Sequence, residues 1–368
     1  MSFKCGIVGL PNVGKSTTFN ALTKSKNAEA ANFPFCTIEP NIGVVAVPDE
    51  RLNKISEIAK SQKIINTLIT FVDIAGLVSG ASKGEGLGNK FLSHIREVDA
   101  IVHLLRCFDS NDIQNVNKTV DPVRDLEIIE TELMLADMES LEKRLSKKNK
   151  VKSDNDDLDD LLGKAFEKLK KGEALNDLIK NYDSKTIKMS NLLSIKPKII
   201  VCNTDEESVA KGNEYTNNVK KKFSNDQVVL ISAEIEQQIN ELNNEEAKDF
   251  MKEIGLDETG LDRLIKSSYK SLDLCTYFTA GPQETRAWTV KNNSKAPDAA
   301  EVIHTDFKKG FIKAEVISYD DYIKFKGETG CRDNGKLRIE GKDYLVKDGD
   351  VLHFRFNTWP YFLHREEN

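Results

Sequence analysis

The chain has 368 residues, of which 39% are hydrophobic and 30% charged, and its net charge is −6 at pH 7. This length and composition predict one to three globular domains, and no stretch is apolar enough to span a membrane. The charge argues against a general DNA-binding surface, so any nucleic-acid contact must come from a local patch. The six scattered cysteines indicate buried thiols in a reducing compartment, and a strand pattern begins too early to leave room for a signal peptide.

A glycine-rich loop near the start of the chain carries the first functional signal. An apolar strand pattern over residues 3–8 precedes it, Gly9–Ser16 reads G-L-P-N-V-G-K-S, and a helical pattern continues to Thr23. The loop matches G-x-x-x-x-G-K-[ST], the phosphate-binding loop of nucleoside triphosphatases. The sequence therefore predicts that the chain binds a nucleoside triphosphate.

The residue types in this loop have separate tasks. Gly9 and Gly14 let the backbone turn tightly so that successive N–H groups face one anion, and the helix start adds its positive end. Lys15 is expected to reach the β- and γ-phosphates, and the Ser16 hydroxyl to bind Mg²⁺.

Two motifs of switch-type nucleotide triphosphatases follow. Thr37 lies in a loop-like segment after Pro34 and is the candidate for a second Mg²⁺ ligand. Asp73-Ile74-Ala75-Gly76 matches D-x-x-G at the end of a strand pattern, where the aspartate reaches Mg²⁺ through water. Leu77 stands where Ras-type enzymes carry the glutamine that orients the attacking water. We therefore expect intrinsic hydrolysis to be slow or to use a group supplied from elsewhere.

Strand and helix patterns alternate through most of the chain. Alternation after a phosphate loop predicts a mostly parallel, doubly wound α/β sheet with the nucleotide at the carboxyl ends of its strands. Helical spacing over residues 122–195 predicts an inserted antiparallel hairpin with its own apolar seam and a mobile tip near 147–156. From about residue 276, short alternating runs predict a small α+β domain. Its expected strands are 286–290, 310–317, 342–346 and 351–356.

The motif that would read the base departs from the guanine-binding pattern. Guanine readers carry N-K-x-D, whose aspartate accepts from two guanine donors, whereas this chain has Asn203-Thr204-Asp205-Glu206. Thr204 replaces the lysine and Glu206 is one methylene longer than aspartate, so the guanine clamp is compromised. Asn203 can still pair with the Hoogsteen edge of adenine, an arrangement that tolerates ATP. The alternative is that these residues cap a helix.

A basic and aromatic cluster in the C-terminal region is a candidate contact for ribosomal RNA. Residues Lys308–Lys313, together with Arg286 and Trp288, interleave positive charge with rings on which bases can stack. The alternative is a strand with Phe311 in the core and the lysines in solvent.

Four segments resemble the YchF family, the Obg-like ATPases, and the resemblance extends from Met1 to about Asn357. They read G-L-P-N-V-G-K-S-T, N-F-P-F-C-T-I-E-P-N, D-I-A-G-L-V-S-G-A-S-K-G-E-G-L-G-N and Y-F-T-A-G-P-Q-E-T-R-A-W-T. The resemblance implies a Ras-like nucleotide-binding domain over residues 1–275, interrupted by a coiled-coil insertion at 122–195. It also implies a C-terminal TGS domain of β-grasp type over residues 276–359.

The resemblance further implies a cytoplasmic protein that prefers ATP to GTP, associates with the ribosome and is linked to translation and stress responses. The family's Mg²⁺ ligands fall on Ser16 and Thr37. Its nucleotide contacts fall on Asn12, Val13, Gly14, Lys15, Ser16 and Thr17, and on Thr204 beside the base.

The resemblance leaves the catalytic group unassigned. Asn115 stands where relatives carry a histidine proposed to replace the missing glutamine, and asparagine cannot act as a base near neutral pH. In some potassium-stimulated relatives of Ras, an asparagine at the position of Asn12 helps to hold K⁺ near the transferred phosphate, so K⁺ is a candidate cofactor.

Three functions stay open at this point. The first is an ATP-hydrolysing switch that governs ribosome binding, the second a nucleotide-dependent binding module with incidental hydrolysis, and the third an Obg-type GTPase. No membrane or DNA partner is expected.

Overall fold

The computed structural model describes residues 3–30, 41–74, 87–110, 119–148 and 156–357. These residues form two compact units, one of residues 3–45 and 70–271, the other of residues 46–69 and 272–357. The domain boundary predicted at residue 275 stays a prediction, and the structure adds that residues 46–69 pack with the C-terminal unit.

Several predicted features fall outside the described residues. They are Thr37, the second half of the D-x-x-G tetrad, Leu77, Asn115 and most of the predicted hairpin tip at 147–156.

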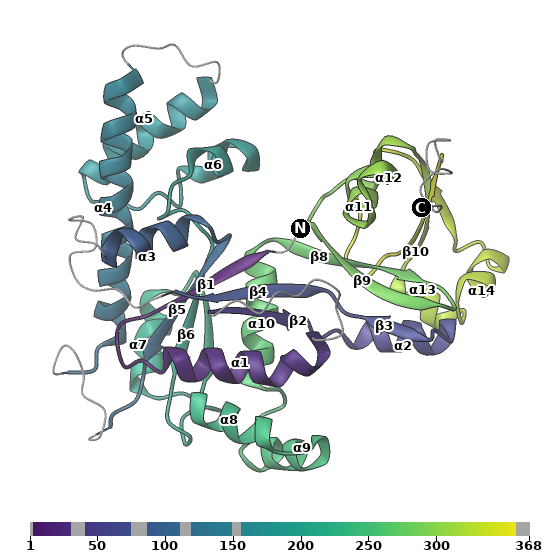
Figure 1. Cartoon of the computed structure of the whole chain (residues 1–368), viewed down its shortest axis with the longest axis horizontal. Helices are drawn as coiled ribbons and strands as arrows, with labels where there is room; N and C mark the ends of the chain where they lie inside the picture. Colours follow the sequence, from purple (N-terminus) through teal and green to yellow (C-terminus); the bar gives the residue numbers. More distant parts are fainter. Residues whose placement is uncertain (1–2, 31–40, 75–86, 111–118, 149–155, 358–368) are drawn as a thin grey trace, which may run out of the picture. The chain divides into compact units, whose positions relative to one another are not determined.

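The larger unit is built on a six-stranded sheet (Figure 1). Its order is β2 (Ile42–Ala46), β4 (Leu68–Asp73), β1 (Lys4–Val8), β5 (Ala100–Arg106), β6 (Lys198–Asn203) and β7 (Gln227–Ile231). β1 is parallel to β4 and β5, and β6 is parallel to β5 and β7. The residues of β5 are all buried, which explains its nearly continuous apolar sequence. Because these strands run the same way, the ends of β1, β4 and β6 lie at one edge of the sheet.

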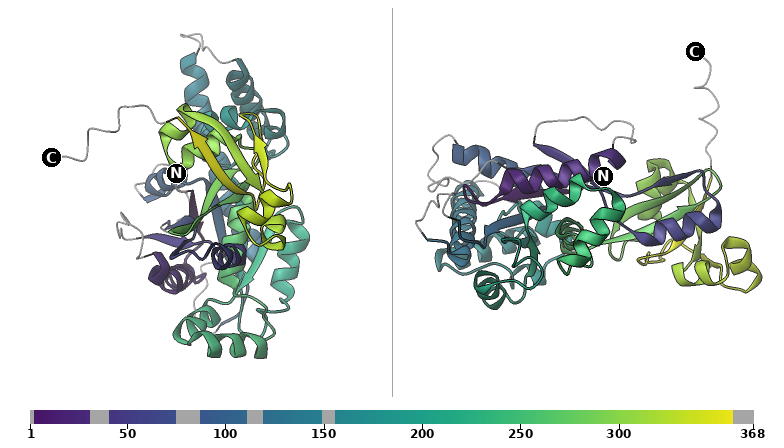
Figure 2. Two further views of the ribbon diagram at one scale, coloured as in Figure 1. Left: turned by 90° about the vertical axis from the view of Figure 1, so that its right-hand side faces the viewer. Right: turned by 90° about the horizontal axis from the view of Figure 1, so that it is seen from below.

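Helices cover both faces of this sheet (Figures 1 and 2). The helices of this unit, including those of the insertion, are α1 (Lys15–Ala30), α3 (Leu87–Arg96), α4 (Pro122–Lys148), α5 (Asp156–Lys170), the 3₁₀ helix η2 (Ile179–Asn181), α6 (Ser184–Ser190), α7 (Glu214–Lys222), α8 (Ala233–Glu241), α9 (Asn244–Glu253) and α10 (Gly260–Ser271). On one face, α3 and α4 share a buried cluster with Val8 and Ile101, and α7 adds Val219 over β6. On the other face, α1 contacts β1, and α10 contacts β5, β6 and β7. This layering confirms the predicted doubly wound α/β fold.

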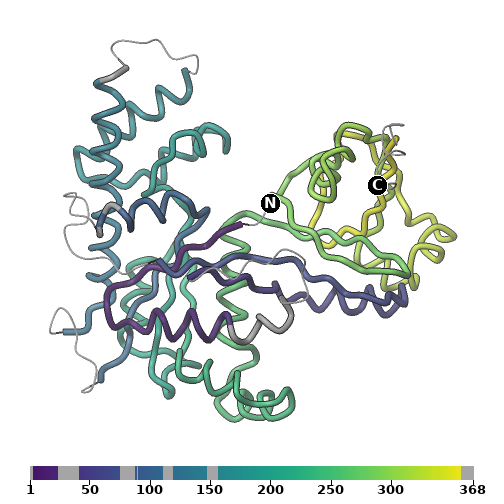
Figure 3. Tube along the Cα trace, in the orientation of Figure 1, coloured from purple at the N-terminus to yellow at the C-terminus, as the bar shows by residue number. Residues whose placement is uncertain are grey.

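The helical insertion leaves the sheet after β5 and returns to it at β6 (Figure 3). α4 and α5 pack together through a buried cluster that includes Leu141 and Leu161. The prediction that the apolar stripe of α4 is the hairpin's own seam is wrong for its first half, because Leu126 and Ile129 pack on the sheet instead. α4 has 27 residues, which is long enough to cross the sheet and then extend into the hairpin.

The smaller unit is built on a second six-stranded sheet. Its order is β11 (Arg338–Glu340), β10 (Phe311–Ile317), β12 (Val351–Phe356), β8 (Leu274–Ala280), β9 (Glu284–Lys291) and β3 (Lys63–Ile65). β8 and β9 are antiparallel, as are β10 and β12, whereas β12 is parallel to β8 and β3 to β9.

Helices pack on both faces of the second sheet. They are α2 (Glu50–Ala59), α11 (Ala296–Ile303), α12 (Thr305–Lys309), α13 (Tyr319–Lys324) and α14 (Glu328–Asp333). α11 packs in a buried cluster that includes Tyr277 and Val316. Leu52 and Ile55 of α2 pack with Phe278 in another buried cluster. Since Tyr277 and Phe278 are neighbours on β8, they point to opposite faces. A mixed sheet crossed by a helix agrees with the β-grasp prediction.

The strand predicted at residues 342–346 is wrong. These residues contain a turn, in which the Tyr344 N–H donates to the Gly341 carbonyl oxygen at 3.2 Å, and a single bridge between Leu345 and Lys295. The apolar alternation misled the prediction because Leu345 is 45% exposed and does not face the core.

Two expectations from the composition concern membrane-spanning segments and cysteines. No helix in the described part of the chain is long and apolar enough to cross a membrane. The five described cysteines are all buried, as predicted. Burial raises the pKa of Cys5 and of Cys275 to about 12, so both thiols stay protonated near neutral pH.

Candidate functional site

The loop between β1 and α1 has the tight backbone that the phosphate-loop motif predicts. Asn12 and Gly14 have positive φ angles of 66° and 88°. A Cβ atom at Gly9 would lie 2.7 Å from the carbonyl oxygen of Leu104, and one at Gly14 would clash with the side-chain nitrogen of Asn203. Space therefore requires glycine at both positions, and at Gly14 the positive φ requires it as well. α1 begins directly afterwards at Lys15, so its positive end faces the loop.

The side chain of Lys15 forms an ion pair with Asp73, the first residue of the D-x-x-G tetrad. β1 and β4 are adjacent and in parallel register, with Ile7 opposite Asp73, so the end of β4 lies beside the loop. The Lys15 and Asp73 side chains are only 14% and 13% exposed. The two motifs, which are 58 residues apart in the sequence, therefore meet in one site.

The other predicted contacts of the loop differ in accessibility. Ser16 is exposed and Thr17 half-buried on the first turn of α1, whereas Val13 is buried and 2% exposed. Only the backbone of Val13 is thus available to a nucleotide. The donors near the loop fit Mg²⁺, because the Ser16 hydroxyl and the Asp73 carboxylate are hard oxygen ligands.

Asn203 ties the loop to the turn after β7. Its Nδ2 donates to the carbonyl oxygen of Val13 at 3.0 Å, and its Oδ1 accepts from the backbone N–H of Ala233 at 3.0 Å. Asn203 is 4% exposed. The oxygen that was expected to accept from adenine thus bonds the backbone, which gives Asn203 a positioning role in this structure.

Thr204 and Glu206 occupy the remaining positions of the base motif. The Thr204 hydroxyl is buried and donates to the carbonyl oxygen of Ile231 at 3.1 Å. Glu206 is exposed, and its carboxylate accepts from Nε2 of Gln238 on α8 at 2.9 Å. Neither residue reproduces the lysine and aspartate of the guanine clamp.

Sequence reasoning missed two residues that the structure brings to this site. Ala233 supplies the N–H that fixes Asn203, and Gln238 holds Glu206. The run Ile231-Ser232-Ala233 at the end of a strand pattern was a usable signal for the first, because a strand that ends beside the base motif meets the same edge of the sheet. No sequence signal singles out Gln238 within α8.

The two histidines of this unit lie on β5 and on α3. His103 is buried inside β5, as predicted, and His94 is exposed on α3. The structure gives no reason to assign either of them a catalytic role at the phosphate site.

Comparison with known proteins places these features in one family. Residues 4–136 match a family described as 50S ribosome-binding GTPase, and residues 274–357 match the family YchF-GTPase_C, described as a protein of unknown function. The chain is 52% identical over 365 residues to the Haemophilus ducreyi protein named ribosome-binding ATPase YchF, covering 97% of this chain and 100% of the relative. A Bacillus subtilis protein of the same name is 49% identical over 369 residues, with the same coverage.

The chain belongs to the YchF family. The solved structure of the YchF GTPase of Schizosaccharomyces pombe has a TM-score of 0.84 and 38% identity, over 96% of this chain and 98% of that one. The match confirms the predicted fold, with its nucleotide-binding domain, helical insertion and C-terminal domain.

The basic cluster of the C-terminal unit is partly neutralised by its neighbours. The ammonium group of Lys308 lies 3.0 Å from Asp298 and 2.6 Å from Glu301. Phe311 is 5% exposed and belongs to the core, as the alternative to an RNA contact predicted. Arg286 stacks on the Trp288 ring at 4.0 Å. The structure therefore gives the RNA prediction little support at Lys308.

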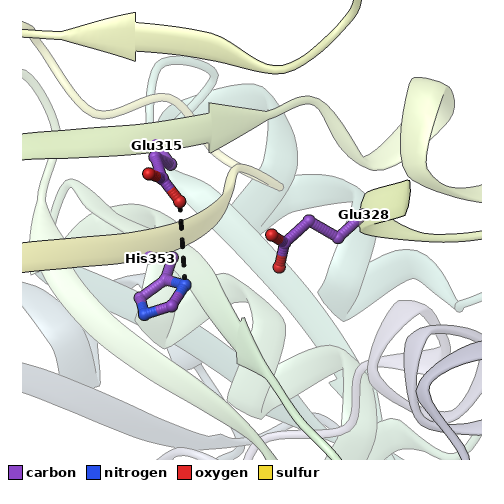
Figure 4. Close-up of side chains that lie close together, drawn as sticks. All are labelled: Glu315, Glu328 and His353. Atoms are coloured by element: carbon purple, nitrogen blue, oxygen red, sulfur yellow. Dashed lines mark ion pairs between the residues drawn. The ribbon is translucent and has the colours of Figure 1, made fainter. Parts of the chain in front are cut away.

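A second cluster of metal-ligating side chains lies in the same unit. Glu315 of β10, His353 of β12 and Glu328 of α14 converge, and His353 lies 3.8 Å from Glu315 (Figure 4). However, Arg355 donates two hydrogen bonds to Glu315, at 3.2 and 3.0 Å, and Arg332 pairs with Glu328 at 2.6 Å. Hydrogen bonding to Arg355 lowers the pKa of Glu315. We interpret the cluster as an ion-pair network.

Proposed function

We propose that this YchF-family chain is an ATP-hydrolysing switch whose nucleotide state governs its binding to the ribosome. The observation that carries the proposal is the Lys15–Asp73 ion pair, because it joins a phosphate-binding lysine to a Mg²⁺-linked aspartate at the carboxyl edge of the sheet. The relatives are named ribosome-binding ATPases, and these names support both the proposed ATP hydrolysis and the proposed ribosome binding.

Mg²⁺ and ATP together would rearrange this pair. We propose that Lys15 exchanges the Asp73 carboxylate for phosphate oxygens, and that Asp73 then bonds a water on the metal. Ser16 and Thr37 would hold Mg²⁺ directly, and the ion would neutralise charge on the β- and γ-phosphates. The backbone N–H groups of the loop and the start of α1 would bind the remaining phosphate charge.

The preference for ATP over GTP rests on the base motif. A guanine clamp needs a free carboxylate for two donors of the base, whereas Glu206 is bonded to Gln238 and Thr204 to the backbone. Guanine would have to share the Glu206 carboxylate with Gln238 and would still lack the lysine. Adenine does not require that carboxylate, so only the binding of GTP is weakened.

We propose K⁺ as a second cation near the loop. Asn12 is exposed at the tip of the loop, where an oxygen ligand beside the transferred phosphate would lie. The ion would supply positive charge where Leu77 leaves no glutamine to orient water. Hydrolysis rates in K⁺ and in Na⁺ at equal ionic strength test this proposal, and equal rates would overturn it.

Single-turnover ATP hydrolysis with and without purified ribosomes tests the switch directly. Strong stimulation by ribosomes is the expected result, because intrinsic hydrolysis lacks a water-orienting glutamine. If ribosomes do not stimulate hydrolysis while ATP still alters ribosome affinity, the chain is a nucleotide-dependent binding module. If neither effect is seen, the proposed link to translation and to stress responses fails as well.

A further inference from the structure

The larger unit contains a cavity of about 280 Å³ that the nucleotide site does not use. Its floor includes Ile101 and His103 of β5 and Lys198 of β6, and its walls include Met134 of α4 and Leu175 at the foot of the insertion. Ile101 and Lys198 lie at the amino-terminal ends of their strands, where they are paired in register. The phosphate loop follows Val8 of β1, which is paired with His103. The residues that line the cavity nevertheless include none of the loop residues 9–16. The cavity is therefore a separate place in the unit.

His103 is the unusual residue of this cavity. It is 1% exposed, and within the described part of the chain its Nδ1 has no hydrogen-bond partner. Buried polar atoms in proteins are nearly always bonded to protein or to an ordered molecule, so this nitrogen points to an occupant. Burial, with a smaller effect of the Lys198 charge, lowers the pKa of His103 to about 3. The ring is thus neutral at physiological pH and offers one donor and one acceptor.

The charged groups around the cavity cancel one another. The Lys198 ammonium is paired with Glu130 and lies 3.3 Å from Asp226. Lys196 is directed to backbone carbonyl oxygens, that of Arg96 at 3.0 Å among them. Two lysines and two carboxylates thus line the cavity, and this balance of charge favours an occupant without net charge.

The rest of the lining is mostly apolar. Leu133, Leu193 and Ile195 line the cavity with Met134, whose thioether makes favourable contacts with aromatic rings. A pocket of apolar walls with a few polar groups that fix orientation is the usual form of a small-molecule site.

We propose that this cavity binds a small, uncharged aromatic molecule that carries one ring N–H or O–H group, with that group hydrogen-bonded to His103. The site lies outside the nucleotide site and does not depend on the proposed ATPase function. Leu133 and Met134 contact the ring, and Lys198 keeps its ion pairs with Glu130 and Asp226.

Indole and indene form a matched pair of probes, because indene has the same shape without the N–H group. The full chain, labelled with ¹⁵N, is titrated with each probe while the imidazole ¹⁵N resonances are recorded. We expect indole to shift the His103 resonance saturably and to bind at least about tenfold more tightly than indene, since the indole N–H would gain a buried bond. The His103→Leu spectrum assigns the resonance, and this variant should bind both probes equally. His94→Gln, at an exposed histidine, should keep the wild-type ratio.

Two further arms keep the test decisive. If His103→Leu does not fold, Met134→Trp, which fills the cavity from α4, should abolish indole binding. Repeating the titration with saturating Mg²⁺–ATP should leave the indole affinity unchanged, whereas loss of binding would place the probe at the nucleotide site. The proposal is overturned if indole produces no saturable His103 shift, or if indole and indene bind the wild type equally, because the cavity then holds only water.

Discussion

The ammonium group of Lys15 and the carboxylate of Asp73 form an ion pair that joins the first residue of α1 to the last residue of β4. Both side chains are mostly shielded from water, so each neutralises a charge that would otherwise be costly to bury. The pair holds together two motifs that bind different parts of one ligand, the phosphates and the metal. Its residues therefore give the sharpest tests of the site.

Replacement of Lys15 by alanine is expected to lower the rate of ATP hydrolysis by about 10²–10³-fold, because the cation that faces the transferred phosphate is lost. Steady-state hydrolysis at saturating Mg²⁺–ATP measures the effect. Lys220→Ala, which removes an exposed lysine from α7, is the control and should hydrolyse ATP at the wild-type rate. Wild-type activity in Lys15→Ala would show that the loop does not hold the reacting phosphate.

Gly14→Ala is expected to destabilise the chain by roughly 1–3 kcal/mol and to weaken ATP binding, because the new Cβ strains the backbone and clashes with Asn203. Gly172 is the matched control, since its φ of 71° is also positive but no atom lies within 4 Å of the position of its Cβ. Gly172→Ala should show only the conformational cost, about 1 kcal/mol. Denaturant unfolding and nucleotide titration measure both variants, and equal effects would contradict the assigned clash.

Asn203→Ala separates positioning from base reading. Since the Asn203 amide bonds the backbone of Val13 and Ala233, its loss should weaken binding of ATP and of inorganic tripolyphosphate by similar factors, about tenfold each. Competition against a fluorescent nucleotide measures both ligands. If the substitution weakens binding of ATP but not of tripolyphosphate, Asn203 contacts adenine directly, as the sequence predicts.

Glu236 makes the stability of the larger unit depend on pH. It is 1% exposed and accepts from the Gly260 N–H at 2.7 Å, and burial raises its pKa from 4.5 to about 7. Between these values the unfolded chain releases a proton that the folded chain keeps, so stability falls as pH rises. The raised pKa of Glu236 therefore lowers the free energy of unfolding by about 3 kcal/mol as the pH rises through this range.

Glu236→Gln should remove that dependence, because the amide oxygen can still accept from Gly260 but does not titrate. The free energy of unfolding of wild type minus variant should therefore decrease from pH 4.5 to pH 7. A difference that stays constant, or increases, over this range would contradict the assigned pKa.

The phosphate loop and the D-x-x-G aspartate were predictable because each motif specifies its own local backbone. Gly14 must adopt a positive φ, and Asp73 must end a strand, whatever the rest of the chain does. That the two motifs meet also followed, because parallel strands end at one edge of a sheet, but the ion pair between Lys15 and Asp73 was not predicted.

Features that depend on packing between distant segments were not predictable. The first half of α4 has the same apolar spacing as the second half, yet Leu126 faces the sheet and Leu141 faces α5. Residues 46–69 carry no sign that they pack with the C-terminal unit. The partner of Glu206 depended on which face of α8 turns towards the base motif, and a helical pattern alone does not fix that rotation.

Competition between ATP and GTP for one labelled nucleotide tests the central claim most directly. We expect ATP to displace the label at a clearly lower concentration than GTP. Thr204→Lys combined with Glu206→Asp should reduce this difference in concentration by restoring the guanine clamp. Displacement by GTP at an equal or lower concentration than ATP in the wild-type chain would contradict the central claim.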